Sequence, residues 1–117
     1  MKKLVTVALI VCVLGSFSTG CNFLSSPAKV EYEITGTAST VFVTISNATG
    51  GTEQFSDVPV PHTYTFEEYT YWYLYISARN EGDAGSVTVT IYVDGEVVAR
   101  STSSGAHVTA SASYFKV

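Results

Sequence analysis

Few side chains of this chain could do nucleophilic chemistry. Its histidines are His62 and His107, and its many serines never fall in a nucleophile-elbow pattern such as G-x-S-x-G. A hydrolase needs a Ser or Cys beside a His that an acidic residue orients, and only composition would support such a triad here. We therefore predict that the protein is not an enzyme and has no catalytic residues. We expect His62 at the start of a strand and His107 just past a turn, both near the surface.

Metal and nucleotide sites find as little support. Carboxylates gather at Glu67-Glu68 and at Glu81-Gly82-Asp83. Calcium prefers such oxygen ligands, but the second segment lacks the spacing of an EF-hand, so a solvated acidic turn is the simpler interpretation. The sequence has no phosphate-binding glycine loop, no metal-binding Cys/His spacing and no nucleic-acid motif. We predict no metal and no cofactor.

The first twenty-one residues carry the strongest signal in the sequence. A basic start precedes an apolar stretch over residues 4–14, and small or polar residues then lead to Cys21. This is the layout of a secretory signal peptide. Its apolar stretch is shorter than the roughly 20 residues that span a bilayer.

The end of this segment resembles the lipobox of bacterial lipoproteins. Thr19 and Gly20 before Cys21 fit that pattern, whereas Ser18 stands where the family prefers Leu. The resemblance implies that residues 1–20 are a cleaved signal peptide. It also implies that Cys21, diacylated on its sulfur, anchors the protein to a bacterial membrane. An ordinary signal peptide cut elsewhere and an uncleaved anchor are the alternatives.

The chain that would remain after cleavage is short and acidic. It has 97 residues, enough for one domain with a modest core. Four basic residues stand against ten acidic ones, so the net charge is −6 with His neutral, which argues against nucleic acid and anionic headgroups as partners. We predict a lipidated Cys and short tether over residues 21–29 and one domain over residues 30–117.

The predicted domain has the pattern of β-strands throughout. Val30, Tyr32 and Ile34 alternate with polar residues, and residues 41–45 and 87–93 alternate in the same way. This period of two, rich in Val, Ile, Thr and Tyr, is typical of half-buried strands. Turn residues separate the runs at the spacing of a sandwich or barrel, so the predicted fold class is all-β.

The clearest turn is Asp94-Gly95, which favours a two-residue hairpin because both residues tolerate positive φ. Such a hairpin pairs Val93 with Glu96, Tyr92 with Val97 and Ile91 with Val98. We expect four residues to share the face of this hairpin that points into the core, and they are Val87, Val89, Ile91 and Val98.

Residues 69–76 form an aromatic run that reads as one strand. In that register Trp72, Leu74 and Ile76 face the core. The opposite face carries four tyrosines, Tyr69, Tyr71, Tyr73 and Tyr75. They either cover the outer face of a central strand, as strand propensity alone would allow, or form a binding face for a sugar, a lipid or a partner protein.

The domain resembles the MmpS-like domain of the small mycobacterial membrane proteins. The resemblance is carried by residues 30–36, by Val58-Pro59-Val60-Pro61, and by Ser77-Ala78-Arg79-Asn80 followed by residues 87–98. It implies a small immunoglobulin-like antiparallel β-sandwich of about seven strands. It also implies an accessory role beside lipid- and drug-exporting envelope transporters. The chain departs from the family in ending its apolar segment on Cys21 and in lacking paired cysteines in the domain.

Together these features predict an exported, lipid-anchored, non-catalytic lipoprotein that is an accessory or binding subunit at the cell envelope. The expected partners are the membrane, through the N-terminal lipid, and an envelope transporter or other envelope protein. The alternative is a stand-alone glycan- or lipid-binding module that uses the tyrosine face. A small hydrolase is the third hypothesis.

Overall fold

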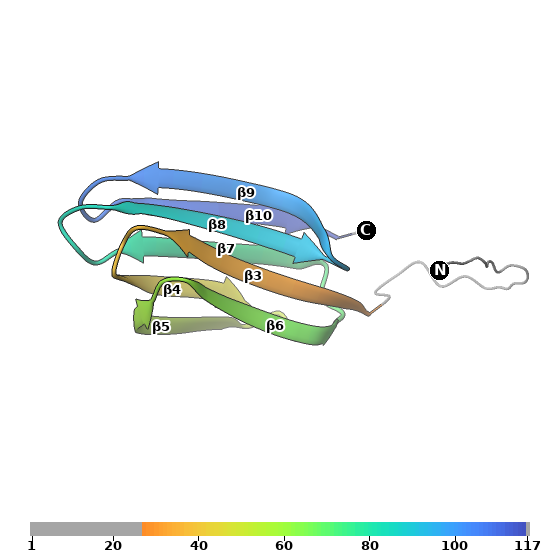
Figure 1. The fold of residues 1–117 in the computed structure, drawn as a ribbon. Coiled ribbons are helices and arrows are strands. Elements are labelled where there is room, and N and C mark those ends of the chain that lie inside the picture. The colour runs from red at the N-terminus through yellow and green to blue at the C-terminus, as the bar shows by residue number, and fades with distance from the viewer. Residues whose placement is uncertain (1–26, 117) are drawn as a thin grey trace, which may run out of the picture.

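The computed structural model describes residues 27–116, which form two antiparallel sheets packed face to face (Figure 1). The predicted signal peptide and Cys21 lie outside the described residues. Within them, no helix is long and apolar enough to cross a membrane. The eight strands are β3 (Ala28–Gly36), β4 (Thr40–Ser46), β5 (Thr52–Pro59), β6 (His62–Tyr69), β7 (Tyr73–Asn80), β8 (Ser86–Val93), β9 (Glu96–Ser104) and β10 (Thr109–Phe115).

One sheet has the strand order β10-β7-β4-β5 and the other β6-β3-β8-β9. Every pairing is antiparallel. The prediction of an all-β sandwich is confirmed, with eight strands in place of about seven. In constant immunoglobulin domains the first two strands pair within one sheet, whereas β3 and β4 lie in different sheets here. The likeness to those domains is therefore one of sandwich architecture.

The core lies between the sheets and is built by the predicted alternation. The inward apolar positions of the central strands are fully buried, and they are Val30, Tyr32, Ile34, Val41, Val43, Ile45, Leu74, Ile76, Ala78, Val87, Val89 and Ile91. Burying one aliphatic side chain of this size contributes roughly 1.5–3 kcal/mol. The apolar faces of the two sheets therefore hold the sandwich together without a disulfide.

The Asp94-Gly95 hairpin is confirmed, with φ of 50° at Asp94 and 85° at Gly95. Val93 pairs with Glu96 and Tyr92 with Val97, as predicted. The predicted pairing of Ile91 with Val98 is wrong, because the register shifts at this point and Ile91 faces Ala99. This bulge leaves Val98 as an extra residue of β9 that is still partly buried against the core.

The prediction of one continuous strand over residues 69–76 is wrong. β6 ends at Tyr69 in one sheet and β7 begins at Tyr73 in the other, so residues 70–72 cross between the sheets. Trp72 lies in this crossing with 53% of its surface exposed, not in the core. Tyr69, predicted to face outward, is fully buried. We call residues 70–72 the corner. The alternation of side chains between the two faces does not continue through it, so the faces predicted from Tyr73 onward do not extend back to Tyr69.

This corner makes a matched pair of aromatic truncations informative. Tyr69→Ala should destabilise the domain by about 3–5 kcal/mol, the usual cost of truncating a buried large aromatic. Trp72→Ala should cost less than about 1 kcal/mol, as for an exposed side chain. Chemical denaturation of a fragment from Ser25 measures both. Equal losses, or a larger loss for Trp72→Ala, would contradict the placement of the corner.

Candidate binding surface

Five aromatic side chains form a connected group on the outside of the molecule. We call Tyr71, Trp72, Tyr73, Tyr75 and Phe115 the aromatic surface. The rings of Trp72 and Phe115 stack with centroids 5.5 Å apart and planes 11° apart. Tyr73 lies 5.2 Å from Phe115 and 6.4 Å from Tyr75, and Tyr71 lies 5.4 Å from Trp72, all between ring centroids.

The aromatic surface is open to solvent. Phe115 is 58% exposed and Trp72 53%, while Tyr71, Tyr73 and Tyr75 are half-buried. Single exposed apolar residues are ordinary on a protein surface. A contiguous group of large aromatic rings is less common and marks candidate interaction sites.

The pairing of β7 with β10 brings these side chains together. Tyr73 stands opposite Phe115 and Tyr75 opposite Ser113. Because side chains alternate across a strand, these residues share the outer face, while Leu74 and Ile76 point into the core. The sequence pattern indicated the three tyrosines but not Phe115. The outward alternation of β10 toward the end of the chain was the only signal for it.

A buried cluster of hydroxyl groups lies under the aromatic surface. Ser46 Oγ accepts a hydrogen bond from the Tyr75 amide (2.9 Å) and lies 2.9 Å from the hydroxyls of both Tyr32 and Tyr69. The Tyr32 hydroxyl donates to the Ser46 carbonyl (2.9 Å), and the Tyr69 hydroxyl donates to the Tyr73 carbonyl (2.8 Å). The cluster therefore ties β3, β4 and β6 to the first residues of β7.

The corner is also held from the other side. The amide of Lys116, just after β10, donates to the Trp72 carbonyl at 2.7 Å. Tyr69 before the corner and Tyr73 after it are fixed by the hydroxyl cluster. With its backbone bonded on both sides, the corner presents Trp72 in a fixed position.

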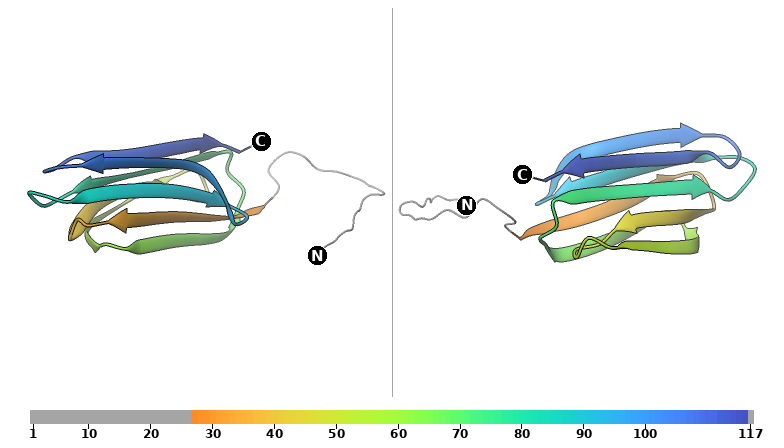
Figure 2. Two further views of the ribbon diagram at one scale, coloured as in Figure 1. Left: turned by 45° about the horizontal axis from the view of Figure 1, so that its top comes forward. Right: turned by 180° about the vertical axis from the view of Figure 1, so that it is seen from behind.

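The aromatic surface lies at the end of the sandwich where the chain enters the fold. Ala28, the first residue of β3, pairs with Tyr69. Figures 1 and 2 show the start of β3, the β6–β7 connection, the β8–β9 hairpin and the C-terminal end of β10 together at this end. The chain that leads back to Cys21 therefore leaves the sandwich beside the aromatic surface.

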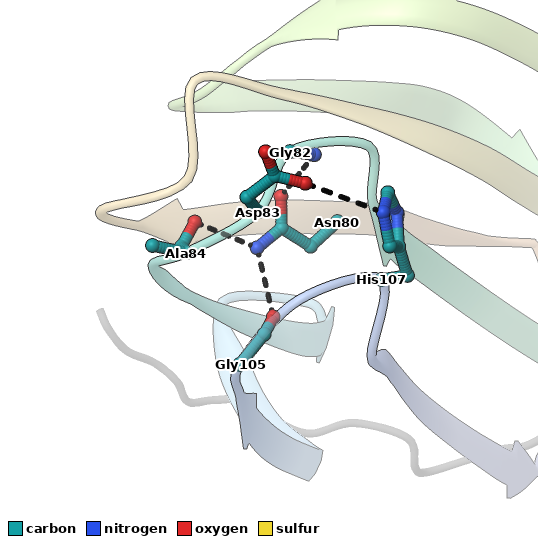
Figure 3. A network of polar contacts seen from close by, with 6 residues as sticks. All are labelled: Asn80, Gly82, Asp83, Ala84, Gly105 and His107. Carbon is teal, nitrogen blue, oxygen red and sulfur yellow. Dashed lines mark hydrogen bonds and ion pairs between the residues drawn. The ribbon is translucent and has the colours of Figure 1, made fainter.

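The two histidines lie at the opposite end and in different surroundings. His62 begins β6, as expected, and its ring packs against Tyr64 with centroids 4.5 Å apart. His107 lies in the exposed β9–β10 connection, and its Nε2 is 3.6 Å from Asp83 Oδ1 (Figure 3). His107 and Asp83 are both well exposed, so their contact is weak.

Figure 3 shows what organises this opposite end: the buried side chain of Asn80. Its Oδ1 accepts from the Gly82 amide (2.8 Å), and its Nδ2 donates to the carbonyls of Ala84 (2.9 Å) and Gly105 (3.0 Å). The predicted acidic turn is thus closed by an amide side chain. Over residues 27–116 no group of three His, Cys, Asp or Glu side chains could hold a metal ion.

No protein-family model and no curated protein matches the chain. The resemblance to the MmpS-like domain stays a prediction.

The hydroxyl cluster should make the stability of the fold decrease at alkaline pH. Burial raises the pKa of the Tyr32 hydroxyl far above its usual value of 10.0. The unfolded chain therefore loses this proton above about pH 10 while the folded chain keeps it, so stability is full below pH 10 and falls above it. We expect a loss of up to about 1.4 kcal/mol per pH unit from Tyr32.

The variant Tyr32→Phe isolates this contribution, because Tyr64 and Tyr92, whose pKa values are also raised, are retained. Denaturant midpoints between pH 9 and pH 12 should fall less steeply for the variant than for the parent protein. Parallel slopes would mean that Tyr32 ionises as readily in the folded protein as in the unfolded chain.

Proposed function

We propose that this protein is an exported, lipid-anchored lipoprotein without catalytic activity, and that it serves as an accessory or binding subunit at the cell envelope. The observation that carries the proposal is the exposed aromatic surface at the end of the sandwich that leads back to Cys21. Its chemistry is that of a contact surface, since Tyr and Trp are the residues that most often dominate binding energy at interfaces.

The support beneath the aromatic surface favours binding. Rings that are already fixed lose little conformational freedom on contact, which improves affinity. Ser46, Tyr32 and Tyr69 fix the start of β7, and Trp72 and Phe115 restrain each other by stacking. The resemblance to the MmpS-like domain places an envelope transporter among the partners to test.

The proposal assigns no chemistry to the histidines. His62 packs against an aromatic ring and His107 faces a carboxylate, both at the end away from the aromatic surface. Neither arrangement brings a Ser nucleophile beside an imidazole, which acyl transfer would require.

A glycan-binding module is the second candidate. Beyond the rings, hydroxyl-bearing residues continue along the same face, with Ser77 opposite Ser111 and Tyr75 opposite Ser113. Ring faces beside hydroxyl groups suit the apolar and polar faces of a sugar. Screening the domain on a glycan array separates the candidates, because a protein-binding subunit would give no signal that depends on Tyr73 and Tyr75.

The lipid anchor is tested by Cys21→Ala. The sulfur of Cys21 is the proposed acylation point, and a mature chain with net charge −6 has little affinity of its own for anionic headgroups. In detergent phase partitioning the variant should no longer enter the detergent phase as mature protein. It should accumulate as unprocessed precursor or as released domain. Cys12→Ala is the matched control and should partition like the parent. A Cys21→Ala protein that is still processed and still enters the detergent phase would refute the anchor.

A further inference from the structure

We propose that the partner of the aromatic surface is the bilayer that holds the Cys21 lipid, with Trp72 and Phe115 seated among zwitterionic headgroups. This inference rests on the proposed lipid anchor. It goes further by assigning the aromatic surface a role in fixing the orientation of the domain on the membrane.

The short tether keeps the aromatic surface close to the lipid. Six residues lie between Cys21 and Ala28, and the seven residue-to-residue steps that join them span at most about 25 Å when the chain is fully extended. Ala28 stands opposite Tyr69, three residues before Trp72. The end of the sandwich that carries the aromatic surface is therefore the end that the tether holds near the lipid.

The side chains of the aromatic surface are of the kind that favours a membrane interface. Trp and Tyr are enriched at membrane–water interfaces because one part of each side chain is apolar and another forms hydrogen bonds. Trp72, the only tryptophan of the chain, and Phe115 are more than half exposed, and the three tyrosines stand beside them. This mixture of apolar rings and hydroxyl groups fits the headgroup region better than it fits bulk water.

The charge at this end of the sandwich favours neutral lipid. At the end of the sandwich with the aromatic surface, four exposed acidic residues stand against the two basic residues Lys29 and Lys116; the acidic residues are Glu67, Glu68, Asp94 and Glu96. Electrostatic attraction to anionic lipid therefore does not drive the contact. Burial of aromatic rings does, so the contact should form on neutral phosphatidylcholine and weaken as anionic lipid is added.

The consequence is a defined orientation. Strands of seven to nine residues run from the aromatic surface to the opposite end, a distance of about 25 Å. The loops held by Asn80, with Asp83 and His107, would then face away from the membrane. They would be the part of the domain presented to other envelope components.

The test uses the full lipidated protein in phosphatidylcholine vesicles, with Trp72 as its own fluorescent probe. Lipids that carry a quencher near the headgroup should lower Trp72 emission roughly twofold or more, as expected for an interfacial ring. Flotation of the same vesicles reports lipid attachment separately.

The control protein carries Trp72→Phe with Thr109→Trp. Thr109 is exposed on β10 and shares the outer face with Phe115, but lies at the opposite end, about 20 Å away. Its tryptophan should not be quenched. The variant Phe115→Ser should weaken quenching of Trp72 without changing flotation.

The outcomes separate the two proposals. A protein that does not float with the vesicles refutes the anchor and this inference with it. A protein that floats, with Trp72 unquenched by lipid but open to aqueous acrylamide, overturns this inference alone. Trp72 shielded from both quenchers would assign the aromatic surface to a second copy of the chain, which also overturns it.

Discussion

The hydroxyl of Ser46 is the interaction on which the aromatic end of the molecule depends. It lies at the end of β4, where four strands from both sheets meet, and it contacts Tyr32, Tyr69 and the amide of Tyr75. A buried polar group without a partner costs about 1–3 kcal/mol. The Tyr75 amide therefore depends on Ser46 Oγ as its acceptor. The hydroxyls of Tyr32 and Tyr69 also donate to backbone carbonyls, and together the cluster fixes where β6 stops and β7 starts.

The corner explains why an aromatic sequence becomes an outer surface. If β6 and β7 were one strand, Trp72 would enter the core and Tyr69 would face water. The hydroxyl cluster instead buries Tyr69 and turns the chain over residues 70–72, which leaves Trp72 free to stack on Phe115. The amphipathic rings then lie at the end of the sandwich where the chain enters β3. With the proposed lipid anchor, this end is the one held beside the membrane.

The sequence was sufficient wherever a single local pattern decided the structure. The alternation around Ile34 and Val89 predicted the core strands, and the Asp94-Gly95 turn predicted a hairpin. It failed at Trp72 because residues 70–72 contain no Gly or Pro, and a run that is aromatic on both faces does not reveal a break. The tertiary hydrogen bonds of Ser46 make that break, and no local signal encodes them. The bulge beside Ile91 was missed because alternation along one strand does not mark a shift in register.

The candidate surface was predicted in part. Tyr73 and Tyr75 do lie together, and Tyr71 is connected to them through Trp72. Their partners Trp72 and Phe115 come from a corner and from a strand distant in sequence. The pairing of β7 with β10 joins residues about forty positions apart, and only the topology supplies that contact.

Amide hydrogen exchange of Ser46→Ala tests the central claim, that the Ser46 hydroxyl holds the corner, most directly. The Tyr75 amide loses its acceptor in this variant, so residues 70–76 should exchange at least about tenfold faster while β3 and β8 stay protected. Ser103→Ala is the control, because it removes one exposed hydrogen bond to the Thr109 carbonyl, away from the corner. Unchanged exchange at Tyr75 in Ser46→Ala would contradict the account.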